Sequence, residues 1–236
     1  MMKILRICPD PPYIRRFREY YARSLRNSVY DEQMLLYRKQ NVIFPGGWHD
    51  AMQNHGFQVF ETIYGDSATM AKWAVENNFN HLLASEDMHS SILVEMVRKF
   101  EPDVIYIFAG AFYKIMPKLR EKMKMACPKG VLITGYWGDE LPESWTYKEH
   151  FRDLDFVFTS SSIYEKHLAN AGINSMTIGN CFDDSIEYIS QSKKYDLIFT
   201  GTTGYGYHDH KLRYEGLVEL MNSTPLRIWA NEPTVA

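Results

Sequence analysis

Residues 101–108, EPDVIYIF, carry the clearest structural signal in the chain. The first three form a turn, and the apolar run that follows them is typical of a strand that is buried on both faces. Strands of this kind belong to parallel sheets whose faces are covered by helices. The segment therefore predicts an α/β protein built around a parallel sheet.

Strands and helices alternate on both sides of this segment. Six strands separated by helices predict a Rossmann-like parallel sheet with helices on both faces. The expected strands cover residues 3–8, 57–62, 104–108, 131–134, 155–159 and 175–178. The expected helices include 67–77, capped by Ser67, one that ends at Phe100, 117–125, and one that Ser160 or Ser161 caps and Gly172 ends.

The chain is expected to contain two domains. Residues 1–190 form the Rossmann-like domain, with a helical insertion at about 13–45 after the first strand. Residues 180–194 show no periodicity and are interpreted as a linker. From 191 to 236 the pattern restarts as strand, glycine loop, helix and strand, which is too little to close a core. We therefore expect an incomplete second α/β unit.

Composition limits the class of protein. With 236 residues, 45% of them hydrophobic and 23% charged, the chain is globular and not disordered. The longest apolar stretch, 104–113, is roughly half of the length that a membrane helix needs, and no leader pattern opens the sequence. Three widely spaced cysteines indicate neither a disulfide framework nor a zinc site. The expected location is the cytoplasm.

The overall net charge of −3 argues against a nucleic-acid partner. One window of the chain differs from this average because it is basic. Between Tyr13 and Lys39, seven basic residues face three acidic ones, and tyrosines lie among them. Apolar residues at helical spacing predict one helix from Tyr13 to Arg26. Such a helix is a candidate for peripheral contact with lipid headgroups at the inner membrane surface, or it is an ordinary packed helix with exposed arginines.

Two glycine-containing turns are candidate phosphate sites. In the loop 201–206, GTTGYG, we expect Gly201, Thr202, Thr203 and Gly204 to direct backbone N–H groups at a phosphate, with Arg213 on the following helix. A flexible turn and a solvated arginine are the alternatives. The pair Gly46 and Gly47 precedes a short helix, 48–54, and would let an anion approach the backbone, or it only forms a turn.

Carboxylates follow the fourth strand, in residues 134–140, TGYWGDE. Asp139 beside Trp137 is a candidate general base, because a partly buried carboxylate has a raised pKa. Trp137 and Glu140 lie in the same stretch, and His49, in the short helix 48–54, is a candidate catalytic residue or an ordinary surface or packing residue. The alternative is a polar loop in which Asp139 makes local backbone bonds. Asp10, after the first strand, is a weaker candidate.

The segment 207–210, YHDH, contains residue types that bind metals, but alternate residues at a helix start diverge, and no third ligand follows. A helix cap by Asp209 explains it better. We expect no metal and no cofactor.

The order of these parts resembles a GT-B glycosyltransferase, in particular the spore-maturation-protein-like (CgeB-like) group. The segments that carry the resemblance are 100–105 (FEPDVI), 155–160 (DFVFTS) with the helix end 168–172 (LANAG), and 194–201 (KYDLIFTG). Gly46 and Gly47 are similar to the glycine pair of many retaining members. Two features depart from the family: about thirty-five residues separate the first strand from that pair, and most of the second domain is absent.

The resemblance implies transfer of a sugar from a nucleoside diphosphate sugar to an acceptor hydroxyl. Helix N-termini and Arg213 would stabilise the diphosphate without a metal. The first domain would hold the acceptor, with Trp137, Glu140 and His49 on the acceptor side, and Asp139 would deprotonate it in an inverting enzyme. Two other classes stay open. One is a non-catalytic α/β module that binds a nucleotide or a protein, and the other is a membrane-surface adaptor that uses residues 13–26.

Overall fold

The structure is a computed structural model that describes residues 1–43, 45–138, 141, 146–179, 192, 194–201 and 211–229. The chain divides into two compact units, Met1–Ile186 and Glu187–Ala236. Each unit is described by itself.

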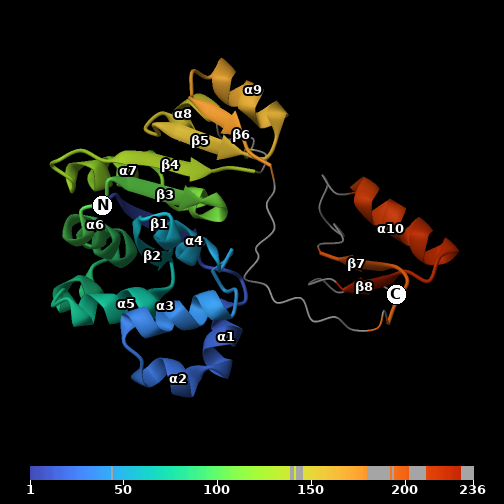
Figure 1. The fold of residues 1–236 in the computed structure, drawn as a ribbon, viewed down its shortest axis with the longest axis horizontal. Coiled ribbons are helices and arrows are strands. Elements are labelled where there is room, and N and C mark those ends of the chain that lie inside the picture. The colour runs from blue at the N-terminus through green and yellow to red at the C-terminus, as the bar shows by residue number, and fades with distance from the viewer. Residues whose placement is uncertain are drawn as a thin grey trace. The chain divides into compact units, whose positions relative to one another are not determined.

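Six parallel strands form the sheet of the first unit (Figure 1). They are β1 (Lys3–Pro9), β2 (Gln58–Tyr64), β3 (Val104–Phe108), β4 (Leu132–Tyr136), β5 (Phe156–Thr159) and β6 (Ser175–Thr177). Their order in space is β2-β1-β3-β4-β5-β6, and every neighbouring pair is parallel. The unit is therefore a Rossmann-like α/β fold, as the alternation of strands and helices predicts.

Helices cover both faces of this sheet because crossovers between parallel strands are right-handed. The connection from β1 to β2 contains α1 (Ile14–Tyr20), α2 (Ala22–Asn27), α3 (Tyr30–Lys39) and α4 (Trp48–Asn54). Of these, α4 packs on the face that carries Arg6, whereas α3 lies beside β2 and packs against α5. The later connections run in the opposite direction along the sheet and lie over its other face. They contain α5 (Ser67–Glu76), η1 (Asn80–Ala84), α6 (Met88–Phe100), η2 (Ala109–Tyr113), α7 (Pro117–Met125), α8 (Tyr147–Phe151) and α9 (Ser162–Asn170).

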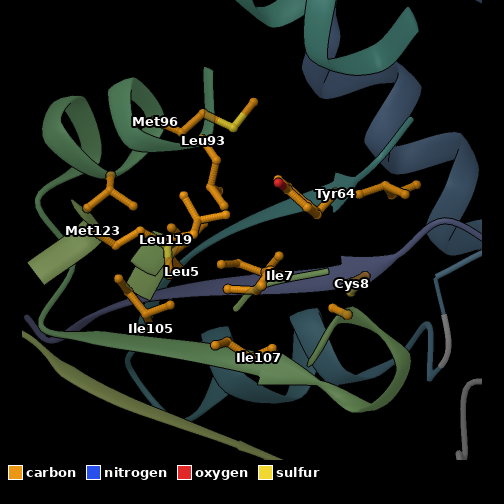
Figure 2. Close-up of a cluster of buried hydrophobic side chains, with 14 of the residues drawn as sticks. Leu5, Ile7, Cys8, Tyr64, Leu93, Met96, Ile105, Ile107, Leu119 and Met123 are labelled. Carbon is orange, nitrogen blue, oxygen red and sulfur yellow. The ribbon is translucent and has the colours of Figure 1, made fainter. Parts of the chain in front are cut away.

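The main core lies between the sheet and helices α6 and α7. Leu5 and Ile7 of β1 and Ile105 and Ile107 of β3 have no exposed surface. Figure 2 shows them gathered with apolar side chains of the two helices, Leu93, Met96, Leu119 and Met123. Successive side chains of a strand point to opposite faces of the sheet. Arg6 and Tyr106, which lie between these core residues, therefore point to the other face, which α4 covers.

The sequence predictions hold for most elements, and three differ in detail. The single helix expected from Tyr13 to Arg26 is two helices, because Tyr21 leaves helical geometry between them. Ser67 is the first residue of α5 and Asp66 is its N-cap, so the expected Ser67 cap is wrong. Strand β4 continues two residues beyond Thr134, through Gly135, which packs against Phe112.

The second unit contains a parallel pair of strands, β7 (Ile198–Thr200) and β8 (Arg227–Trp229), and the helix α10 (Lys211–Ser223). Leu217 is the buried apolar residue of this helix, whereas Leu212 is 83% exposed and Trp229 is 47% exposed. No helix among the described residues is long and apolar enough to cross a bilayer.

Candidate functional site

The order of the strands reverses at β1. The chain continues from β1 to β2 on one side and later returns to β3 on the other side. In open parallel sheets, ligands bind beyond the carboxyl ends of the strands at such a switch point, because the two crossovers leave in opposite directions. The residues that follow β1, β2 and β3 are therefore the first place to look for a site.

Asp10 and Lys114 form an ion pair at this edge of the sheet. Asp10 follows β1 and Lys114 follows η2, and their side chains are 26% and 46% exposed. Gly65, directly after β2, has φ = +103°, and a Cβ there would lie 2.9 Å from both Asp10 Oδ1 and Lys114 Nζ. The positive φ favours glycine at this position, where β2 ends beside the pair. The edge offers one anionic and one cationic group that solvent can reach.

A second polar group lies inside the protein, on the face of the sheet under α4. Arg6 of β1 and Glu61 of β2 are register partners, and Arg6 Nη1 donates to Glu61 Oε1 at 3.0 Å. Both side chains are fully buried. Burial of a charge is costly unless it is paired, so this contact fixes the position of both strands.

Glu61 also accepts from Arg38 Nη1 at 3.1 Å and from His49 Nδ1 at 2.9 Å, both at Oε2. Burial alone would raise the pKa of Glu61, but the hydrogen bond from His49 and the charges of Arg6 and Arg38 outweigh it and lower the pKa. Glu61 is therefore ionised, and His49 Nδ1 carries the proton that it donates. The contact fixes the orientation of the imidazole ring.

Aromatic rings complete the surroundings of Arg6. Its guanidinium lies 4.7 Å from the Trp48 ring and 5.0 Å from the Phe108 ring, and Trp48 stacks on Tyr106 with a centroid distance of 5.6 Å. Arg6 Nη1 also donates to the Pro45 carbonyl oxygen at 3.2 Å. These contacts attach α4 to the sheet by cation–π interaction and stacking.

A cavity of about 700 Å³ opens beside this cluster, along the outer edge of β2. Arg38, His49 and Glu61 are among the residues that line it, together with Tyr30 and Phe60, whose rings stack at 5.7 Å. The volume lies within the range of small-molecule sites. The His49–Glu61 pair is thus a positioned imidazole and carboxylate in the wall of a cavity.

The glycine pair predicted as a phosphate site lies at the start of α4. A Cβ on Gly46 would lie 2.6 Å from the Arg38 carbonyl oxygen and 2.7 Å from Asn41 Oδ1. Close packing against the end of α3 is therefore sufficient to require glycine at 46. Gly47 is the N-cap of α4, and phosphate binding by the pair stays a prediction. His49, two residues later, belongs to the buried cluster described above.

Trp137 does not lie where the sequence analysis expects it. It has no exposed surface and packs edge-to-face against Phe112, His150 and Phe151. A side chain without exposed surface offers no contact to an acceptor, so we correct its role from acceptor binding to the core. Asp139 and Glu140, which follow it, lie outside the described residues.

The other predicted phosphate-binding residues are in the second unit. Gly201 directly follows β7 with φ = +140°, and its N–H donates to the Trp229 carbonyl oxygen at 3.0 Å. Arg213 is exposed in the first turn of α10. Thr202, Thr203 and Gly204 lie outside the described residues, as does the segment 207–210. The structure thus leaves the phosphate role of this loop a prediction.

Metal-binding and thiol chemistry find no support in the described part of the chain. It contains no group of three or more His, Cys, Asp or Glu side chains that could hold a metal ion. Cys8 and Cys127 are buried and form no disulfide. Burial raises the pKa of the Cys8 thiol to about 12, so it stays protonated and is not a nucleophile at neutral pH.

Sequence analysis misses five charged or glycine residues of these sites: Arg6, Arg38, Glu61, Gly65 and Lys114. A signal for two of them exists in the sequence. Arg6 and Glu61 each occupy the middle of a mostly apolar strand, and charged residues are almost never fully buried unless they are paired. Two strands that each carry one such charge, of opposite sign, are therefore expected to be neighbours in the sheet.

The fold defines the chain as a Rossmann-like α/β protein, a class that serves many functions. No protein-family model and no curated protein matches the chain. One solved structure that it resembles is a glycosyltransferase from Rickettsia africae ESF-5. The match covers 98% of this chain and 68% of that chain at 11% sequence identity, with a TM-score of 0.35. A likeness at this level carries no argument about activity.

Proposed function

We propose that the chain acts in glycosyl transfer, moving a sugar from a nucleoside diphosphate sugar to an acceptor hydroxyl. One observation carries the proposal: a six-stranded parallel sheet with its switch point at β1 and β3 is followed along the chain by a second parallel α/β pair. The sequence segments that resemble GT-B enzymes of the CgeB-like group support it, since they fall in β3, β5 and β7.

In this proposal the acceptor binds to the first unit, at the edge where Asp10 and Lys114 are exposed. A carboxylate and an ammonium group there accept from and donate to the hydroxyls of an acceptor. Asp139, which follows β4 at the carboxyl end, is the general base if the reaction inverts the sugar's configuration. The proton of the acceptor hydroxyl then passes to its carboxylate as the new glycosidic bond forms.

The donor binds to the second unit through its diphosphate. Backbone N–H groups of the loop that begins at Gly201, together with Arg213, stabilise the negative charge that develops on the leaving nucleoside diphosphate. These groups take the place of a metal ion. The bond that breaks joins the anomeric carbon to the phosphate oxygen, and the electron pair leaves with the diphosphate.

The test measures release of nucleoside diphosphate from a panel of nucleotide sugars by the purified chain, with water as the acceptor of the sugar. We expect release from donors of one base, and a decrease of about 10- to 100-fold in Arg213→Ala, because a hydrogen bond to a charged group is lost. Arg98→Ala, on the surface of α6, is the matched control and should not change the rate. Absence of release from every donor, or equal losses in both variants, would favour a non-catalytic binding module.

A further inference from the structure

Helices α1 and α2 lie at the end of the first unit opposite to α9 (Figure 1). No residue of α1 is buried, and Leu25 is the buried residue of α2. Helices this short are marginal in water by themselves. Ile14, Phe17 and Tyr21 pack against the core from one side, while Arg18 binds Asp66 at 2.7 Å. The helices are attached by these contacts, and the remainder of their surface faces solvent.

The solvent-facing side of these helices is basic and aromatic. Arg15, Arg16, Arg23 and Arg26 are exposed there. Two tyrosines are also exposed: Tyr20, the last residue of α1, is 83% exposed, and Tyr13, its N-cap, is 50% exposed. Tyrosine and arginine at one surface are typical of contact with the headgroup region of a bilayer, where a ring needs both apolar and polar surroundings.

The charge of this segment is opposite to that of the rest of the molecule. Residues 14–27 contain five arginines and one glutamate, a net charge of +4. The rest of the first unit holds 16 basic and 22 acidic residues, a net charge of −6. A positive end on an acidic unit turns toward an anionic surface and keeps the rest of that unit away from it. Charge complementarity therefore predicts an anionic partner and an orientation in which residues 14–27 face that partner.

A groove of about 420 Å³ between α2 and α5 indicates which anionic partner fits. Its apolar lining is aliphatic and includes Leu25, Ala68, Ala71 and Val75. Arg18, Arg26 and Lys72 are its basic residues. A groove for single-stranded nucleic acid places aromatic rings against the bases, and the lining here contains none. Aliphatic and basic groups together match a phospholipid, which has a hydrocarbon part and an anionic phosphate.

We propose that α1 and α2 dock the protein on the surface of a bilayer that contains anionic phospholipid, with the α2–α5 groove in contact with the lipid. The binding is peripheral and reversible, since four arginines and two tyrosines enter only the headgroup region. The proposal is independent of the glycosyl transfer proposed above.

The test is sedimentation of the full chain with vesicles of phosphatidylcholine, alone or with about 30% phosphatidylserine. Each basic residue near an anionic surface strengthens binding about fivefold, so Arg23→Gln combined with Arg26→Gln should weaken it about 25-fold. Lys148→Gln combined with Lys166→Gln, on α8 and α9, removes the same charge elsewhere and should have little effect. Both lysines are exposed.

Preferential binding to the anionic vesicles, its loss in the arginine variant and its retention in the lysine variant would support the proposal. Salt titration of the wild-type chain gives a test that needs no variant, because binding through exposed charges declines as salt screens them. Equal binding to both vesicle types, equal losses in both variants, or binding insensitive to salt would overturn it. Binding to a single-stranded RNA oligonucleotide without binding to vesicles would assign the surface to nucleic acid instead.

Discussion

Replacement of Glu61 by glutamine tests the buried cluster at the centre of the first unit. Glu61 is the carboxylate that Arg6, Arg38 and His49 share, at distances of 3.0, 3.1 and 2.9 Å. Glutamine preserves the volume but removes the negative charge, so the fully buried Arg6 guanidinium loses its counter-charge. Loss of one partner of a buried ion pair costs about 3–5 kcal/mol. The expected decrease in the melting temperature is on the order of 10 °C.

Urea denaturation followed by tryptophan fluorescence measures this effect. Arg6→Met in the Glu61→Gln background removes the uncompensated charge, so the double variant should lose less stability than the sum of the single variants, with a coupling of about 0.5–3 kcal/mol. Glu95→Gln removes a carboxylate from an exposed pair on α6 and should change the unfolding free energy by less than about 0.5 kcal/mol.

The same variant changes the dependence of stability on pH. Because the pKa of Glu61 is lower in the folded than in the unfolded protein, its stabilisation is complete above the unfolded pKa and is lost as pH falls through the folded pKa. The unfolding free energy of Glu61→Gln should therefore lack the decrease at acid pH that Glu61 causes in the wild-type protein. A loss of less than about 1 kcal/mol at neutral pH, or strict additivity with Arg6→Met, would refute the reasoning.

Two further predictions concern α8 and β4. Burial, together with the charge of Arg120, lowers the pKa of His150 from 6.5 to about 4, so the unfolded chain takes up a proton that the folded protein does not. The unfolding free energy should therefore fall by up to about 1.4 kcal/mol per pH unit as pH decreases from 6.5 to 4, and urea titrations of His150→Phe should lack this slope. Gly135→Ala should destabilise by 1–3 kcal/mol or more, because the new Cβ would lie 2.3 Å from the Ile107 carbonyl oxygen and 2.4 Å from Phe112. Gly110→Ala, whose Cβ would meet Pro9 at an ordinary 3.5 Å, is its control; equal midpoints of denaturation in the two variants would contradict the packing argument.

Local patterns were sufficient to predict most of the fold. The bounds of β3 and α7 follow from an apolar run and from a proline at a helix start, and both signals lie within the segment itself. The break at Tyr21 between α1 and α2 could not be predicted in this way. Apolar residues continue at helical spacing through Tyr21, and the break depends on how two short segments pack on the core.

The candidate sites were harder to predict because they depend on which strands are neighbours. The pairing of Arg6 with Glu61 joins residues that are 55 positions apart, and the pairing of Asp10 with Lys114 joins residues 104 apart. The same limit explains why the burial of Trp137 was not predicted. Its place after β4 suggests an exposed loop, but Phe112 and Phe151 from other elements enclose it.

Thermal denaturation of the chain with nucleoside diphosphates and their sugars tests the proposed function most directly. A ligand at 100 times its dissociation constant stabilises the protein by about 2.7 kcal/mol. Glycosyl transfer predicts a shift with one base only, and its loss in Gly201→Val and in Arg213→Ala. No shift with any nucleotide, or a shift that both variants retain, would contradict the account.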